Sequence, residues 1–150
     1  MLNKGDKIPE ISLENQHGEL ISLSDFTGKK PLVVYFYPKD NTSVCTAQAC
    51  GFRDHYEEFQ EVGAEVIGIS RDSTSSHKRV STKRKLPFIL LSDTRKKALK
   101  AFKIPSTLFG LVPGRVTFII DRHGIIVHSF RADFNANQHI KESLRILKSL

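Results

Sequence analysis

Residues 32–53, LVVYFYPKDNTSVCTAQACGFR, carry the features that decide the fold of this chain. The first six form a compact run of β-branched and aromatic side chains, which predicts a buried strand. Pro38 ends that run, because proline cannot donate a hydrogen bond in a central sheet. After a polar loop, apolar residues recur at helical spacing from Cys45 onward. The stretch is therefore expected to be a strand, a loop and a helix that carries both cysteines, Cys45 and Cys50.

Strands and helices alternate through the rest of the chain. A polar turn at residues 15–18 predicts a small N-terminal hairpin. Four more strands are expected at residues 65–70, 89–91, 116–120 and 125–130. Four helices are expected. The one that carries the cysteines should end at Gly63, and the next should run from Ser73 to about Lys85. The third should run from Asp93 or Thr94 to about Phe102, and the last should bury Ile140, Leu144 and Leu147. This order predicts an α/β fold with a central mixed sheet flanked by helices.

Composition sets the class of protein. A length of 150 residues, a hydrophobic fraction of 39% and ten Phe favour one domain spanning residues 1–150. No apolar run approaches the roughly 20 residues of a membrane helix, so no membrane association is expected. The N-terminal sequence MLNKGDKIPE lacks the apolar core of a secretory signal, and we therefore expect a cytoplasmic protein. In a reducing compartment, two close cysteines favour catalysis or metal binding over a permanent disulfide.

Basic charge is concentrated in one segment. Residues 71–103 carry eleven Lys and Arg against two acids, whereas the remainder carries twelve against fourteen, for a total of +7. Such a segment could attract nucleic acid or an acidic protein. Its charges follow helical patterns with few aromatic residues and no groove-reading motif. We therefore expect solvated helix faces and no nucleic-acid binding, with docking of an acidic reductase as an open alternative.

Position alone leaves two interpretations of Cys45 open. It falls in the first turn of the predicted helix, where unpaired N–H groups and the helix dipole stabilise a thiolate. Thr42 could place a hydroxyl near that sulfur, as a nucleophilic cysteine requires. Alternatively, Cys45 is simply a small buried residue on the apolar stripe of the helix.

Cys50 adds a geometric constraint. On one continuous helix its Cα would lie on the order of 8.7 Å from that of Cys45. That separation exceeds the ~7 Å limit for a disulfide, so a bond between them requires the helix to unwind locally. A switchable pair is thus favoured over a static disulfide. A metal site is disfavoured because the six histidines form no matching pair of ligands, and a thioredoxin-type motif would have two intervening residues instead of four.

The segment PKDNTSVC, residues 38–45, resembles the peroxiredoxin active-site pattern of Pro, Thr and Cys. The continuation TAQACGFRD is similar to the peroxiredoxin Q, or bacterioferritin comigratory protein, subfamily. Further matches lie at residues 68–72, 86–93 and 114–121, so the resemblance covers nearly the whole chain. It implies a thioredoxin-like fold and a thiol-dependent peroxidase that reduces hydrogen peroxide and organic hydroperoxides.

The resemblance also implies a role for five residues. Cys45 would be the peroxidatic cysteine and Cys50 the resolving cysteine. Thr42 would hydrogen-bond to the thiolate and to the substrate. Pro38 would shield the sulfur, and Arg115 would be the active-site arginine. Thioredoxin or a similar dithiol protein would recycle an intramolecular disulfide, with no metal or other cofactor, in a monomer or weak homodimer.

One departure from the subfamily pattern is Ser43, which stands where many members have proline. Serine leaves the approach to Cys45 freer, and we expect a modest loss of preorganisation. A competing hypothesis shares the cysteine chemistry but ends in binding. In it, a redox sensor or chaperone-like protein would expose Phe52 and Phe59 on oxidation.

Overall fold

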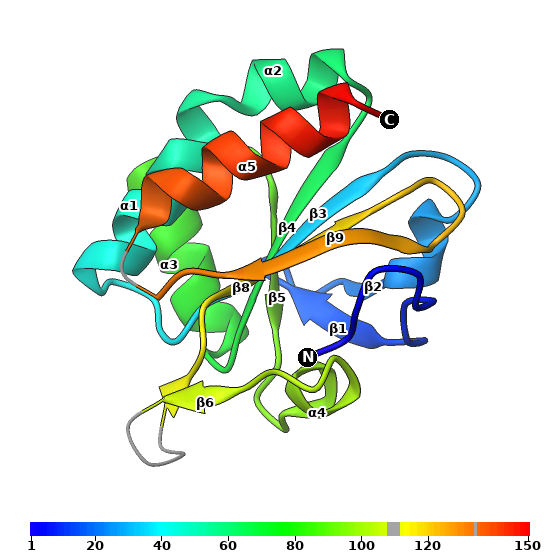
Figure 1. Ribbon diagram of the computed structural model, residues 1–150. Coiled ribbons are helices and arrows are strands. Elements are labelled where there is room, and N and C mark those ends of the chain that lie inside the picture. The colour runs from blue at the N-terminus through cyan, green and yellow to red at the C-terminus, as the bar shows by residue number, and fades with distance from the viewer. Residues whose placement is uncertain (108–111, 134) are drawn as a thin grey trace.

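The structure is a computed structural model that describes residues 1–107, 112–133 and 135–150. Its centre is a seven-stranded mixed sheet in the order β2-β1-β5-β4-β3-β8-β9 (Figure 1). The strands of this sheet are β1 (Ser12–Asn15), β2 (Leu20–Ser22), β3 (Leu32–Phe36), β4 (Glu65–Ser70), β5 (Ile89–Ser92), β8 (Val116–Ile120) and β9 (Ile126–Arg131). A separate pair is formed by β6 (Ser106–Thr107) and β7 (Val112–Pro113). The helical elements are η1 (Leu23–Phe26), α1 (Ser43–Asp54), α2 (Tyr56–Glu61), α3 (Thr74–Arg84), α4 (Lys97–Ala101) and α5 (Ala136–Lys148).

Strand β3 organises the two cores of the molecule. It pairs in parallel with β4 and antiparallel with β8, and every one of its residues is buried. Because side chains alternate along a strand, Val33 and Tyr35 enter one core while Val34 and Phe36 enter the other. The loop that leads to α1 therefore leaves from the C-terminal end of a strand fixed on both sides.

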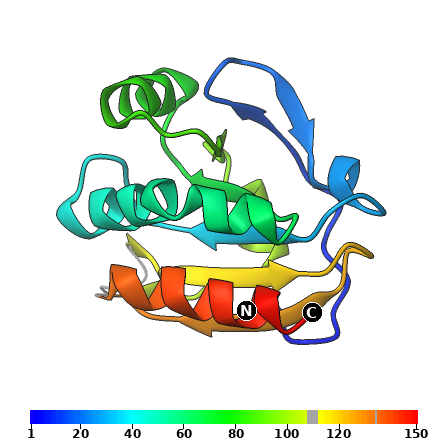
Figure 2. The ribbon, with the colours of Figure 1, turned by 90° about the horizontal axis from the view of Figure 1, so that it is seen from above.

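Helices cover the two faces of the sheet unequally. The core around Tyr35 is covered by α1, α2, α3 and α5, whereas α4 and the N-terminal segment close the core around Phe36. Figure 2 shows α1 and α2 running alongside α5 above the sheet, with α3 next to them. Gly68 of β4 permits close packing on this face, since a Cβ there would lie 2.7 Å from the Tyr35 ring.

Most of the expected elements are confirmed. The N-terminal hairpin, the central strands, the β8–β9 hairpin and the buried face of α5 lie where the sequence predicts them. Ser73 caps α3 through its side chain, which accepts from Ser76 N–H. Part of the irregular segment expected before residue 116 lies outside the described residues.

Two helices differ from the prediction. The helix expected to continue to Gly63 is interrupted at His55, which separates α1 from α2. Phe52 and Phe59 lie on either side of this break, and both are fully buried with ring centroids 5.5 Å apart. The α4 helix begins later than expected, because the Asp93 carboxylate accepts from the N–H groups of Ala98 and Leu99 across an intervening turn.

Candidate active site

Cys45 is the third residue of α1, with Thr42 at the N-cap position. Its side chain is buried, and both it and the half-buried Cys50 are free thiols. The N–H groups of the first helical turn lack intrahelical acceptors and, together with the helix dipole, make this end of α1 electropositive. Both cysteines lie on one continuous helix, so the distance constraint on a disulfide applies to this structure.

Arg115 reaches the sulfur from a distant part of the chain. Its Nη1 lies 3.1 Å from Cys45 Sγ and 2.8 Å from Gln48 Oε1, and the arginine is only 5% exposed. The planar guanidinium can donate both hydrogens of Nη1 at once, one to each acceptor. A permanent positive charge is thereby held against the thiol in a site that water scarcely reaches.

The sheet explains how Arg115 comes to this position. Val116 pairs with Phe36, so the residue before β8 lies beside the end of β3, where the loop to α1 begins. Gly114 allows the chain to approach closely, because a Cβ there would lie 2.9 Å from Pro105 O and 3.1 Å from the Arg131 side chain. Glycine at position 114 therefore fits the crowded start of β8 next to Arg115.

Gln48 and Asp133 complete the environment of Arg115, and neither was singled out from the sequence. Gln48 is fully buried, and its position three residues after Cys45 on α1 was the available signal. Asp133 accepts from Arg115 N through Oδ1, while its backbone oxygen accepts from Arg115 Nε, both at 3.1 Å. Burial acts to raise the pKa of Asp133, but hydrogen bonds from Arg131 and from the Arg115 backbone outweigh it and lower the pKa.

Thr42 and Pro38 flank the same loop without contacting the sulfur through a hydrogen bond. The exposed Thr42 hydroxyl donates to Lys39 O at 3.0 Å, and Pro38 is half-buried directly after β3 and Tyr37. Among the described residues, the side chain found to donate to Cys45 is Arg115. The expected roles of Thr42 and Pro38 therefore stay predictions.

His139 is a buried group close enough to Arg115 to be affected by its charge. Its Nδ1 lies 2.6 Å from the Thr117 hydroxyl and its Nε2 lies 2.8 Å from Ala132 O. Burial is the main cause that lowers the pKa of His139 to about 4, and the positive charge of Arg115 lowers it further. The neutral ring satisfies both contacts, with Nε2–H donating to the carbonyl and Nδ1 accepting from the hydroxyl.

The comparisons with known proteins decide the family. The model of the AhpC/TSA family matches residues 4–129. Over 149 residues, the chain is 50% identical to "Peroxiredoxin Q, chloroplastic" of Sedum lineare and 49% identical to the protein of that name from Oryza sativa subsp. japonica. These alignments cover 99% of this chain and 80% and 68% of the two relatives. The chain belongs to the AhpC/TSA family, the peroxiredoxins.

Solved structures agree with this membership. The peroxidoxin BcpB of Mycobacterium tuberculosis matches with a TM-score of 0.93 and 30% identity over 100% of this chain and 99% of that one. A cysteine-to-serine mutant of PrxQ from Xylella fastidiosa matches with a TM-score of 0.91 and 33% identity, covering 99% and 97%. The thioredoxin-like fold is thus confirmed, and this peroxiredoxin is an oxidoreductase with thiol-dependent peroxidase activity that requires a peroxide and a thiol reductant.

The expectation of a cytoplasmic location is wrong. The relatives of Sedum, Oryza and Populus are named chloroplastic, and these names contradict that expectation. The expectation relied on the lack of an apolar leader, a criterion that detects secretory signals but not the polar, Ser- and Arg-rich transit peptides of plastids. Within residues 1–107, 112–133 and 135–150, no helix has the length and apolar character to span a membrane. Within the same ranges, no group of three or more His, Cys, Asp or Glu could hold a metal.

The pKa of His139 predicts how stability depends on pH. Below about pH 6.5 the unfolded chain protonates this histidine, whereas the folded protein does not until about pH 4. The unfolded state then binds more protons, so the free energy of unfolding falls by up to about 3 kcal/mol as pH drops through this window. Urea unfolding at pH 7 and pH 4.5 should show that His139→Gln loses less stability than the wild type. The matched control is His123→Gln at an exposed turn, and equal losses in wild type and His139→Gln would contradict the prediction.

Proposed function

We propose that Cys45 is the peroxidatic cysteine and Cys50 the resolving cysteine of this peroxidase. The observation that carries the proposal is the contact between Arg115 Nη1 and Cys45 Sγ at the start of α1. The thiolate attacks one peroxide oxygen, so that an S–O bond forms as the O–O bond breaks. The other oxygen leaves with a proton as water or alcohol, and Cys45 becomes a sulfenic acid.

Arg115 is proposed to stabilise the charge that moves between sulfur and the two oxygens. Its contacts with Gln48 and Asp133 fix the guanidinium before substrate arrives, and a preorganised donor costs no reorganisation during reaction. Thr42 is proposed to turn its hydroxyl from Lys39 O toward the sulfur or the peroxide. Pro38 is proposed to shape the loop that shields the sulfur.

The second step is proposed to join the two cysteines. The Cys50 thiol attacks the sulfenic sulfur of Cys45, an S–S bond forms and water leaves. On the intact helix their Cα atoms lie on the order of 8.7 Å apart, so the first turns of α1 must unwind before this bond can form. A dithiol protein such as thioredoxin then returns both thiols by exchange. In total, a hydroperoxide and two thiols give alcohol or water, one further water and a disulfide.

The whole chain, residues 1–150, is proposed to act as one peroxiredoxin domain, because strands from both ends of the chain share one seven-stranded sheet.

We propose a monomer or weak homodimer. Among the described residues, the large hydrophobic side chains that are exposed are the scattered Met1, Leu20 and Leu150. Scattered residues of this kind do not form the contiguous apolar patch that a stable interface needs.

Single-turnover oxidation tests the proposed roles. Cys50→Ser should still react with one equivalent of peroxide but should stop at a sulfenic acid, seen as a mass gain of one oxygen and trapped by dimedone. Cys45→Ser should not react. Arg115→Lys keeps the charge but loses the fork and should slow oxidation about 100-fold.

The matched control is Arg145→Lys, which changes an exposed arginine of α5 paired with Glu142. It should oxidise at the wild-type rate. A Cys50→Ser protein that loses its remaining thiol without a trappable sulfenic acid would contradict the assignment of the two cysteines. An Arg115→Lys protein as fast as Arg145→Lys would contradict the role of Arg115.

The reductant is proposed to dock on the basic end of α3. Arg53 of α1 donates to Arg84 O at 2.7 Å, which places this end of α3 beside the helix that carries both cysteines. Lys78, Lys83 and Lys85 are exposed there. Within the part of the chain that the structure describes, no ion pair neutralises a lysine or arginine of residues 71–103. An acidic surface on the reductant would complement this charge.

Salt should therefore weaken the reductant step. Raising NaCl from about 50 to about 300 mM should increase the KM for an acidic thioredoxin about threefold or more, while peroxide oxidation keeps its rate. Lys83→Glu should raise the same KM at low salt. The control is Lys29→Glu, which should not; Lys29 is exposed and lies before the N-terminal end of β3, whereas the loop to α1 leaves the C-terminal end. A KM that ignores both salt and Lys83→Glu would rule out docking at α3.

A further inference from the structure

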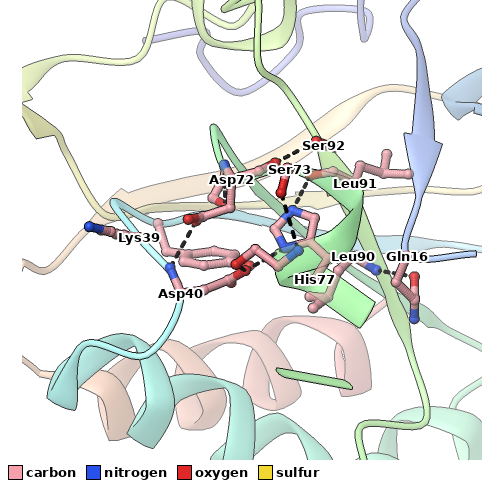
Figure 3. Close-up of polar contacts among 12 residues, drawn as sticks. Gln16, Lys39, Asp40, Asp72, Ser73, His77, Leu90, Leu91 and Ser92 are labelled. Carbon is pink, nitrogen blue, oxygen red and sulfur yellow. Dashed lines mark hydrogen bonds and ion pairs between the residues drawn. The ribbon is translucent and has the colours of Figure 1, made fainter. Parts of the chain in front are cut away.

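A buried polar network holds the loop that joins β3 to α1. This loop, residues 38–42, contains Pro38 and Thr42 with Asp40 between them. Asp40 is 6% exposed although it carries a carboxylate. The same small cavity is lined by Asp40 and Cys45, so the network lies next to the reactive sulfur. Figure 3 shows the contacts of this region.

Both oxygens of Asp40 are occupied. Oδ1 accepts from the Tyr37 hydroxyl at 2.7 Å. Oδ2 accepts from the Ser76 hydroxyl at 2.8 Å and lies 2.8 Å from His77 Nδ1. Burial acts to raise the pKa of Asp40, but its contacts with His77, Tyr37 and Ser76 outweigh that and lower the pKa, which keeps the carboxylate charged.

His77 connects this carboxylate to the sheet. It is fully buried on α3, and its Nε2 lies 3.0 Å from Leu91 O of β5 (Figure 3). Both of its neighbours are acceptors, so a hydrogen on either ring nitrogen has a partner. The loop is thus joined to the rigid strand β5 through a charge-assisted contact with His77, a residue of α3.

The backbone of the loop is held at the same point. Asp40 N donates to Asp72 Oδ2 at 2.8 Å, and that oxygen also accepts from the Ser70 hydroxyl at 2.6 Å. The next residue, Asn41, has a φ of 63°, a left-handed conformation that asparagine adopts more readily than most non-glycine residues. The Asp72 carboxylate therefore holds the loop through its backbone directly before this turn.

We propose that Asp40 and His77 are positioning residues that hold residues 38–42, and with them the first turn of α1, in the conformation from which Cys45 reacts with peroxide. Their contact belongs to the folded form of α1 and weakens when α1 unwinds toward Cys50. Its strength therefore sets the balance between oxidation, which needs the folded helix, and disulfide formation, which needs the unwound one. This proposal rests on the proposed roles of the two cysteines.

The balance has a chemical readout at high peroxide. The sulfenic acid of Cys45 either condenses with Cys50 or is oxidised again to a sulfinic acid by a second peroxide. A weaker contact at Asp40 should favour the unwound helix, and thus condensation over further oxidation. A loss of general stability alone gives no reason for the two rates to move in opposite directions.

The experiment measures both steps by stopped flow and mass spectrometry in full-length variants. Asp40→Asn and His77→Gln should each slow oxidation of Cys45 about tenfold, while disulfide formation from the sulfenic acid becomes about threefold faster or more. Sulfinic acid should fall accordingly at high peroxide. The double variant should change disulfide formation by less than the product of the single effects, because the two residues share one contact. Tyr37→Phe removes only the hydroxyl bond to Oδ1 and should shift both rates about twofold in the same directions.

The control is Ile126→Ala, which removes buried volume in the core on the other face of the sheet and away from the loop. It should lower stability without opposite changes in the two rates. The proposal is overturned if Asp40→Asn, or Tyr37→Phe should Asp40→Asn not fold, leaves both rates at the wild-type values or shifts them together as Ile126→Ala does. Failure of the underlying function is distinguishable, because the wild type would then form no disulfide in the same experiment.

Discussion

An intact helix keeps Cys45 and Cys50 too far apart for a disulfide, and this constraint shapes the whole site. The two residues sit five positions apart on α1, where helix geometry separates their Cα atoms by on the order of 8.7 Å. The same helix also places Cys45 in its first turn, at the electropositive N-terminal end. In the proposed mechanism, one state of α1 is suited to attack on peroxide by Cys45 and another to disulfide formation with Cys50.

The rest of the structure is arranged around the first of these states. Arg115 directly precedes β8, and its side chain is held beside the Cys45 sulfur by contacts with Asp133 and Gln48. The loop before α1 is tied to α3 and β5 through Asp40 and His77. Strand β3, buried throughout and paired on both sides, provides the rigid base from which the loop and α1 depart. Rigid surroundings therefore enclose the segment that rearranges in the proposed mechanism.

Sequence patterns predicted the elements better than the contacts between them. Periodicity placed β3, β4 and the β8–β9 hairpin, because buried strands and tight turns have strong local signatures. It missed the interruption at His55, since the stripe of apolar residues continues across it. Cys45 was predicted from its motif, whereas Gln48 and Asp133 contact Arg115 and have no motif of their own. Extending the β8–β9 register by two residues would have pointed to Asp133. Helical spacing from Cys45 would have pointed to Gln48.

The most direct test of the central claim is amide hydrogen exchange before and after one equivalent of hydrogen peroxide, with intact mass and free thiols recorded on the same samples. We expect a mass lower by two hydrogens, loss of both thiols, and loss of protection confined to the amides around residues 43–50 while β3 and β4 keep theirs. Disulfide formation with full protection retained in α1 would contradict the claim that the helix must unwind. Loss of protection throughout the sheet would contradict the claim that the change is local.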